Sequence, residues 1–99
     1  MTASLAAVAE HEPVWFLYMI RCKNGSLYTG ISTNVERRFA AHQAGKGAKY
    51  LRGKAPLRLV YQQAIGSHSE ALKVELQIKQ MSKHDKEQML APSASAQAD

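Results

Sequence analysis

The distribution of apolar and polar positions along the chain predicts three strands and three helices. Residues 14–22 form a nearly unbroken apolar run that is rich in aromatic and β-branched side chains. Such a run is typical of a strand that is buried on both faces and is therefore central in its sheet. Two more strands are predicted over residues 26–31, after an Asn-Gly turn, and over residues 57–64. In the last strand one face is predicted to hold Leu57, Leu59 and Tyr61.

The length of the turn between the first two strands decides which side chains share a face. If the loop is Asn-Gly alone, Tyr18 and Tyr28 lie on opposite faces of the sheet. If the loop is Lys-Asn-Gly with Gly25 in the left-handed conformation, Tyr18 pairs with Gly30 and both phenols lie on one face. Gly30 has no side chain, so in that register the Tyr18 ring could lie across it. The sequence by itself leaves both registers open.

A helix is predicted directly after the second strand, where polar residues offer N-cap oxygens. Its apolar stripe begins at Val35 and continues at Phe39. At about 100° per residue, Arg38 and His42 lie on the border of this stripe, whereas Arg37 points to solvent. The two adjacent arginines are therefore expected to behave differently.

The helix predicted over residues 69–81 carries a carboxylate inside its apolar arc. Glu75 lies between two apolar edges, one of which is formed by Leu72 and Leu76. A carboxylate in that position is costly unless it is paired or binds a metal. Lys79 is spaced for an ordinary ion pair with Glu75, worth a few tenths of a kcal/mol, and is an equally good candidate for a phosphate contact. The helix alone leaves pairing and metal binding open.

Length and composition limit the chain to one small folded unit. Its 99 residues include a single cysteine, which excludes an internal disulfide and a cysteine-based zinc site. The Ala- and Ser-rich segments 1–12 and 91–99 are predicted to be mobile tails, and residues 13–90 the folded domain, which ends in a short helix. No apolar run is long enough to span a membrane, and the N-terminus lacks the basic start of a signal peptide. A cytoplasmic protein is expected.

The charge balance favours an anionic partner. Thirteen Lys and Arg residues against eight Asp and Glu residues give a formal net charge of +5, and nucleic acid is the commonest partner of such proteins. The loop before the third strand concentrates basic side chains around one tyrosine: Lys46, Lys49, Tyr50, Arg52 and Lys54. Cations that follow a phosphate backbone, with a ring that stacks on bases, are typical of nucleic-acid-binding segments. A loop that is merely solvated is the plainer interpretation.

The polar residues of the predicted site follow a regular spacing. Two tyrosines stand ten residues apart, an arginine follows the second by ten, and a histidine follows the arginine by four. This pattern, which extends over about residues 14–90, resembles the GIY-YIG nuclease domain and most closely its small stand-alone YhbQ-like branch. The residues that carry the resemblance are Tyr18, Tyr28 with Thr29 and Gly30, Arg38, His42 and Glu75.

The resemblance implies an α+β fold, in which a small three-stranded antiparallel sheet is flanked by helices. It also implies a divalent-metal-dependent endonuclease that hydrolyses phosphodiester bonds in nucleic acid, with DNA as the first candidate. Mg²⁺ or Mn²⁺ would be the cofactor, with Glu75 as its only protein carboxylate. Arg38 would hold the scissile phosphate, and His42 would assist with proton transfer or phosphate contact. Tyr18 and Tyr28 would position or deprotonate the attacking water.

Two departures from the family pattern keep a second function open. Phe16 and Leu17 stand where the first motif has glycine and isoleucine, and no asparagine follows Glu75. The complete set of two tyrosines, arginine, histidine and glutamate favours the endonuclease. The departures are compatible with a nucleic-acid-binding module that keeps the nuclease fold and cuts little or not at all. In a purely structural or partner-binding domain, the third possibility, the position of Glu75 would be accidental.

Overall fold

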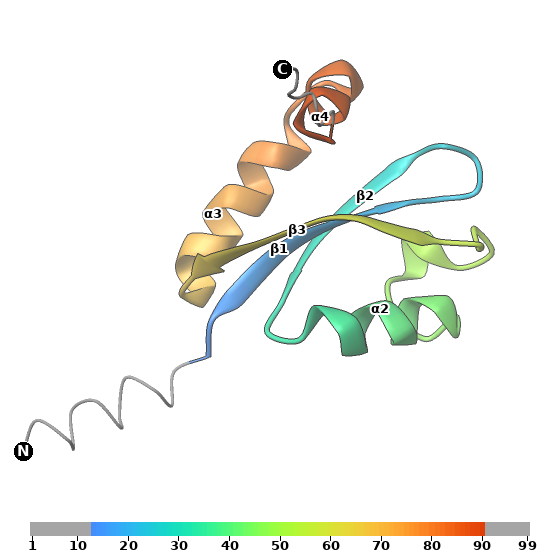
Figure 1. Cartoon of the computed structure of the whole chain (residues 1–99), viewed down its shortest axis with the longest axis horizontal. Coiled ribbons are helices and arrows are strands. Elements are labelled where there is room, and N and C mark those ends of the chain that lie inside the picture. Colours follow the sequence, from blue (N-terminus) through green and yellow to red (C-terminus); the bar gives the residue numbers. More distant parts are fainter. Residues whose placement is uncertain (1–12, 91–99) are drawn as a thin grey trace, which may run out of the picture.

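The structure is a computed structural model that describes residues 13–90, and both segments predicted to be mobile tails lie outside these residues. A three-stranded antiparallel sheet lies between α2 on one side and α3 on the other (Figure 1). The sheet has the order β2-β1-β3 and consists of β1 (Trp15–Arg21), β2 (Leu27–Ser32) and β3 (Arg58–Gly66). The helices are α2 (Val35–Gln43), the short 3₁₀ helix η1 (Lys49–Leu51), α3 (His68–Lys79) and α4 (Lys83–Leu90). The predicted α+β fold is confirmed.

The apolar run becomes the central strand, as predicted. Residues Leu17 to Ile20 of β1 are at most 1% exposed because the strand is paired on both edges and covered on both faces. Tyr18 and Ile20 belong to a core with α2 and the loop that follows it, whereas Leu17 and Met19 pack with α3. We call these two sides of the sheet the α2 face and the α3 face.

The register between β1 and β2 is the one that the three-residue loop predicts. Tyr18 pairs with Gly30, Ile20 pairs with Tyr28, and Gly25 has a φ of 89°. This positive φ is open to glycine at little cost, which lets the chain reverse within the loop. Both phenols therefore lie on the α2 face.

The strand β3 departs from the predicted alternation. A register shift opposite Met19 and Ile20 interrupts its pairing with β1. Tyr61, beyond the shift, therefore packs in the α3-face core, whereas Leu57 is buried in the α2-face core and Leu59 is exposed. The prediction that these three side chains share one face is wrong, because a β-bulge adds a residue and breaks the period of two.

One apolar edge of α3 is not packed. The helix begins after Ser67, which forms a capping box with Glu70, and it buries Ala71 and Ile78 against the α3 face. Leu72 and Leu76 are 45% and 58% exposed. The apolar edge formed by Leu72 and Leu76 therefore faces solvent and does not enclose the carboxylate. No helix within residues 13–90 combines the length and the apolar character that crossing a bilayer requires.

Candidate active site

A buried hydrogen bond joins β1 to α2 on the α2 face. Tyr18 Oη lies 2.9 Å from His42 Nε2, and the other ring nitrogen, Nδ1, accepts from the Ala48 backbone N–H at 3.1 Å. A neutral imidazole carries a single proton, so the Ala48 contact assigns that proton to Nε2. His42 thus donates to the Tyr18 oxygen, and the Tyr18 hydroxyl proton is available for another acceptor.

The surroundings keep both members of this pair neutral. Burial raises the pKa of Tyr18 to about 12; Tyr28 adds to this shift and the Arg38 guanidinium opposes it. Burial lowers the pKa of His42, and the charge of Arg38 lowers it further. At neutral pH Tyr18 is a hydrogen-bonding phenol and His42 an uncharged imidazole.

Two glycines give these rings their space. A Cβ atom at Gly30 would lie 2.6 Å from Tyr18 Oη, so the Tyr18 ring lies across this glycine. This is the arrangement predicted for the register with the three-residue loop. A Cβ atom at Gly47 would overlap Nδ1 of His42. The sequence predicted no structural role for Gly47, although the Gly-Ala-Lys-Tyr stretch that it begins resembles the same family branch. Neither position has room for a side chain, because the Tyr18 ring fills the space at Gly30 and the His42 ring fills the space at Gly47.

Gly47→Ala is expected to lower the free energy of unfolding by about 1–3 kcal/mol, the usual effect of overpacking. The added methyl group would displace the His42 ring and with it the Ala48 hydrogen bond. Urea titrations of the parent and the variant measure the change. In a His42→Ala background the same substitution should have a much smaller effect, because the overlapping ring is gone. Additive effects of the two substitutions would contradict this explanation.

The stability that neutral His42 contributes should depend on pH. Because the pKa of His42 is lowered from 6.5, the unfolded chain binds this proton first as the pH falls. The contribution is complete above pH 6.5 and is lost as the pH decreases through the folded-state pKa. We expect the free energy of unfolding to fall more between about pH 7.5 and about pH 5.5 in the parent than in His42→Gln. Parallel pH profiles in urea titrations would argue against a buried neutral imidazole.

Tyrosines extend the site from the buried pair to the surface. The Tyr28 ring has its centroid 5.6 Å from that of His42 in an edge-on arrangement, and Tyr50 stacks on Tyr28 at 6.0 Å. Tyr50 is 47% exposed, and Lys54 Nζ lies 3.5 Å from the centroid of its ring. Of the five loop residues predicted to contact nucleic acid, these two adjoin the aromatic row; the remaining three are exposed: Lys46, Lys49 and Arg52.

Both arginines of α2 line a hollow of about 230 Å³ that also involves Thr33 and Asn34. Arg37 is exposed, as the helical period predicts, and its side chain borders this surface hollow. The two side chains still differ, since Arg38 is close enough to shift the pKa values of Tyr18 and His42. A guanidinium at the edge of a hollow, beside two neutral hydrogen-bonding rings, is suited to bind a phosphate.

Glu75 lies on α3, which packs on the opposite face of the sheet. Its side chain is 18% exposed, and Oε2 is 3.2 Å from Lys79 Nζ. The ion-pair alternative is therefore the arrangement present, and Glu75 makes no hydrogen bond with the tyrosines or the histidine of the α2 face. Both α3 and α2 nevertheless contact the edge strand β2.

Few carboxylates are available to hold the divalent metal that the family resemblance implies. Within the described residues no three His, Cys, Asp or Glu side chains gather, so a metal would depend on a lone carboxylate such as Glu75. Mg²⁺ commonly binds through one or two carboxylates and takes its remaining ligands from water and substrate phosphates. A single partly exposed carboxylate fits this requirement.

Comparison with known proteins identifies the family of the chain. Residues 14–88 match the family model of the GIY-YIG catalytic domain, and the chain belongs to this family. A UPF0213 protein of Cronobacter sakazakii is 61% identical over 77 residues, which cover 78% of this chain and 81% of the relative. The UPF0213 protein YhbQ of Escherichia coli K12 is 52% identical over 80 residues, which cover 81% and 80%. Within the family the chain belongs to the YhbQ-like branch, as its motifs predict.

Two solved structures are similar in fold. The solution structure of the UPF0213 protein BH0048 from Bacillus halodurans is 43% identical, with a TM-score of 0.54 over 83% of this chain and 87% of that one. The protein EF2693 from E. faecalis is 27% identical, with a TM-score of 0.57 over 89% and 95%. The fold is thus shared with a sequence relative of the same branch.

Proposed function

We propose that this protein is a divalent-metal-dependent endonuclease that hydrolyses phosphodiester bonds in DNA. The observation that carries the proposal is the cluster on the α2 face, where Tyr18, His42 and Tyr28 adjoin Arg38. A phosphodiester hydrolase needs a cation for the phosphate and groups that orient a water molecule, and this cluster supplies both. Membership of the GIY-YIG family supports the nuclease fold.

Arg38 binds the scissile phosphate in this proposal. Its guanidinium lines an open hollow and stays charged at every physiological pH. As the phosphorus is attacked, negative charge builds on the non-bridging oxygens, and two parallel N–H donors stabilise that charge more than a single ammonium would.

The two phenols have different roles. At a pKa of about 12, Tyr18 is almost fully protonated at neutral pH, so it serves as a hydrogen-bond donor and not as a base. His42 acts as a positioning residue, because its Nε2–H fixes the Tyr18 oxygen and leaves the phenol proton directed elsewhere. Tyr28 is less buried and lies between Tyr18 and Tyr50, so we assign to it the positioning of the attacking water.

Glu75 would hold Mg²⁺ or Mn²⁺. Its partner Lys79 is half-exposed and can release the carboxylate at the small free-energy cost typical of such pairs. A bound divalent cation would neutralise the leaving oxygen. The contact of both α2 and α3 with β2 supports the proposal that Arg38 and Glu75 act on one phosphate across this edge strand. The basic loop and Lys79 would follow the neighbouring phosphates.

A second candidate is a nucleic-acid-binding module that does not cut. The Glu75–Lys79 ion pair favours it, because a carboxylate that stays paired is not free to hold a metal. The same basic loop and aromatic row would then serve binding alone.

A panel of labelled single-stranded, duplex and branched DNA and RNA separates the two candidates. With Mg²⁺ or Mn²⁺, the endonuclease is expected to cut at least one DNA substrate, to stop in chelator, and to keep its binding there. Binding in chelator without cleavage of any substrate in either metal would establish the binding module instead. Cleavage of RNA alone would overturn the assignment to DNA.

A further inference from the structure

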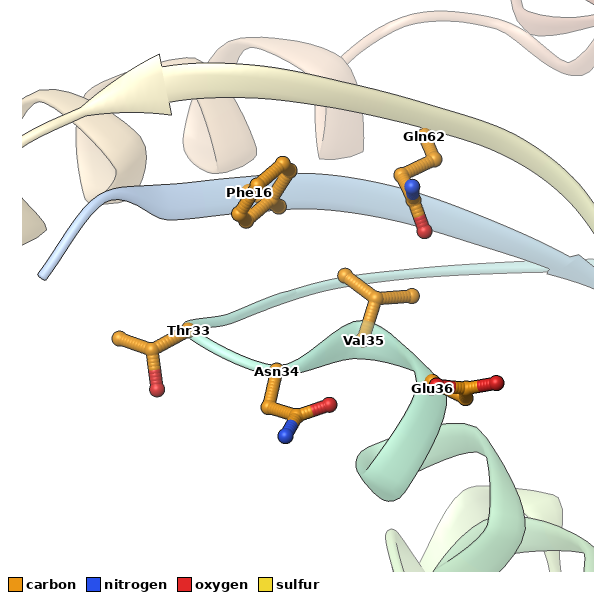
Figure 2. Close-up of a pocket in the computed structure, with 6 residues that line it drawn as sticks. All are labelled: Phe16, Thr33, Asn34, Val35, Glu36 and Gln62. Carbon is orange, nitrogen blue, oxygen red and sulfur yellow. The ribbon is translucent and has the colours of Figure 1, made fainter.

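A second hollow on the α2 face lies next to the one that contains Arg38. It has a volume of about 260 Å³ and lies between the sheet and the first turn of α2, and its lining is Phe16, Thr33, Asn34, Val35, Glu36 and Gln62. Figure 2 shows Gln62 and Val35 pointing toward one another across this space, with Phe16 beside them on β1. Its volume is below the roughly 300–1,000 Å³ of pockets for drug-sized ligands, which suits a single planar ring system.

Phe16 packs against the α2-face core and contributes a partly exposed ring to the hollow. Its neighbours across the sheet are Ser32 on β2 and Ala64 on β3, both small. The ring is therefore only partly buried although it faces the same side as Tyr18. An open aromatic face next to an amide side chain is the combination that binds nucleobases, by stacking and by hydrogen bonds to a base edge.

Charge distinguishes this hollow from its neighbour. Two arginines line the hollow on the other side of Thr33 and Asn34, whereas Glu36 lines this one. A carboxylate repels a phosphate but accepts a hydrogen bond from an exocyclic amino group of a base. The two hollows share Thr33 and Asn34, so they are adjacent on the surface.

The lining of the second hollow lies close to the proposed catalytic residues on the sheet. Phe16 and Tyr18 are two residues apart on one strand face, which separates them by about 6.7 Å. Gln62 pairs with Tyr18 across the sheet, so the amide also adjoins the phenol proposed to act in catalysis.

We propose that this hollow is a base-binding subsite, in which Phe16 stacks on a nucleobase next to the scissile phosphate. Gln62 and Glu36 contact the edge of that base and favour one with an exocyclic amino group. The inference rests on the proposed function, which makes the ligand a DNA strand. It concerns the binding of that DNA and not its cleavage.

A thermodynamic cycle tests the subsite in chelator, where no cleavage occurs. Fluorescence anisotropy gives the affinities of the parent and of Phe16→Leu for oligo(dC) and for an abasic strand of equal length, which has the same phosphates and no bases. Phe16→Leu is expected to weaken oligo(dC) binding by about 5- to 100-fold and to leave abasic binding unchanged, because only the base contacts the ring. Phe16→Tyr keeps the ring and should bind as the parent does.

The outcomes of these binding measurements separate a failure of the base-binding subsite from a failure of the proposed function. Equal weakening on both strands would overturn the subsite, since Phe16 would then act through the fold, and would leave the proposed function intact. Glu36→Gln changes an exposed residue and should reduce the preference for oligo(dC) over oligo(dT); an unchanged preference would overturn the role of the base edge. Leu72→Ala on the α3 face is the matched control and should alter no affinity. A parent that binds no strand would overturn both proposals.

Discussion

Arg38→Ala is expected to lower the rate of DNA cleavage by about 10³- to 10⁵-fold, the range measured when a charge-stabilising arginine is removed from phosphoryl transfer. The physical reason is that charge develops on the phosphate during the reaction, so the guanidinium stabilises the transition state more than the bound substrate. Single-turnover cleavage in Mn²⁺ measures the rate, and anisotropy in chelator measures affinity, which should change less than about tenfold. Arg38→Lys should recover only part of the loss, because an ammonium does not offer two parallel donors.

The adjacent arginine provides a matched control. Arg37 lines the same hollow but is not among the groups that shift the pKa of Tyr18. Arg37→Ala should therefore weaken binding modestly and leave the single-turnover rate within about tenfold of the parent. Equal cleavage by the parent and by Arg38→Ala would indicate a contaminating nuclease. Equal losses of cleavage rate in Arg37→Ala and Arg38→Ala would indicate that Arg38 is only a general phosphate contact.

Glu75→Gln is expected to abolish metal-dependent cleavage, with a loss of at least about 10³-fold, and to leave nucleic-acid binding in chelator unchanged. The substitution keeps the shape of the side chain and removes the negative charge that a hard divalent cation requires. Cleavage should be followed over a range of Mn²⁺ concentrations, so that a weakened metal site is separated from a lost one. Direct Mn²⁺ binding, measured by electron paramagnetic resonance with bound DNA, gives a readout independent of turnover.

The ion pair on α3 allows a complementary test. Lys79→Met removes the partner 3.2 Å from Glu75 and should lower the Mn²⁺ concentration needed for half-maximal cleavage, because the carboxylate no longer has to leave a cation. Asp85→Asn removes an exposed carboxylate from α4 and raises the net charge by one, as Glu75→Gln does, so it is the net-charge control for Glu75→Gln. Normal cleavage by Glu75→Gln would show that the metal is held elsewhere, and would favour the reading in which Glu75 is only an ion-pair partner.

Local pattern was sufficient for much of the fold because each strand and helix carries its own physical signal. The apolar run of β1 can be satisfied only in the centre of a sheet, and the helix predicted over residues 69–81 is observed as α3, one residue earlier at its start. The helical period also placed His42 beside the buried stripe. The bulge in β3 left no such signal, because it depends on how two distant strands are paired.

Within the candidate site, residue types and spacing were predictable, but contacts were not. The spacing of Tyr18, Tyr28, Arg38 and His42 identified the family, and the structure places these residues on one face. That Ala48 orients His42, and that Gly47 makes room for it, could not be read from the chain. A hydrogen bond between a loop and a helix is set by where the loop packs.

The sequence by itself determined the family, the central strand and the approximate positions of the helices, and it supplied the candidate residues of the site, because propensity, capping and hydrophobic period act over a few neighbouring residues. Only the tertiary structure decided the register that puts both phenols on one face, the proton position on His42, and the separation of Glu75 from the α2 face. These properties arise where segments distant in the chain meet, and there packing and hydrogen-bond satisfaction select one arrangement among several that the local signals permit.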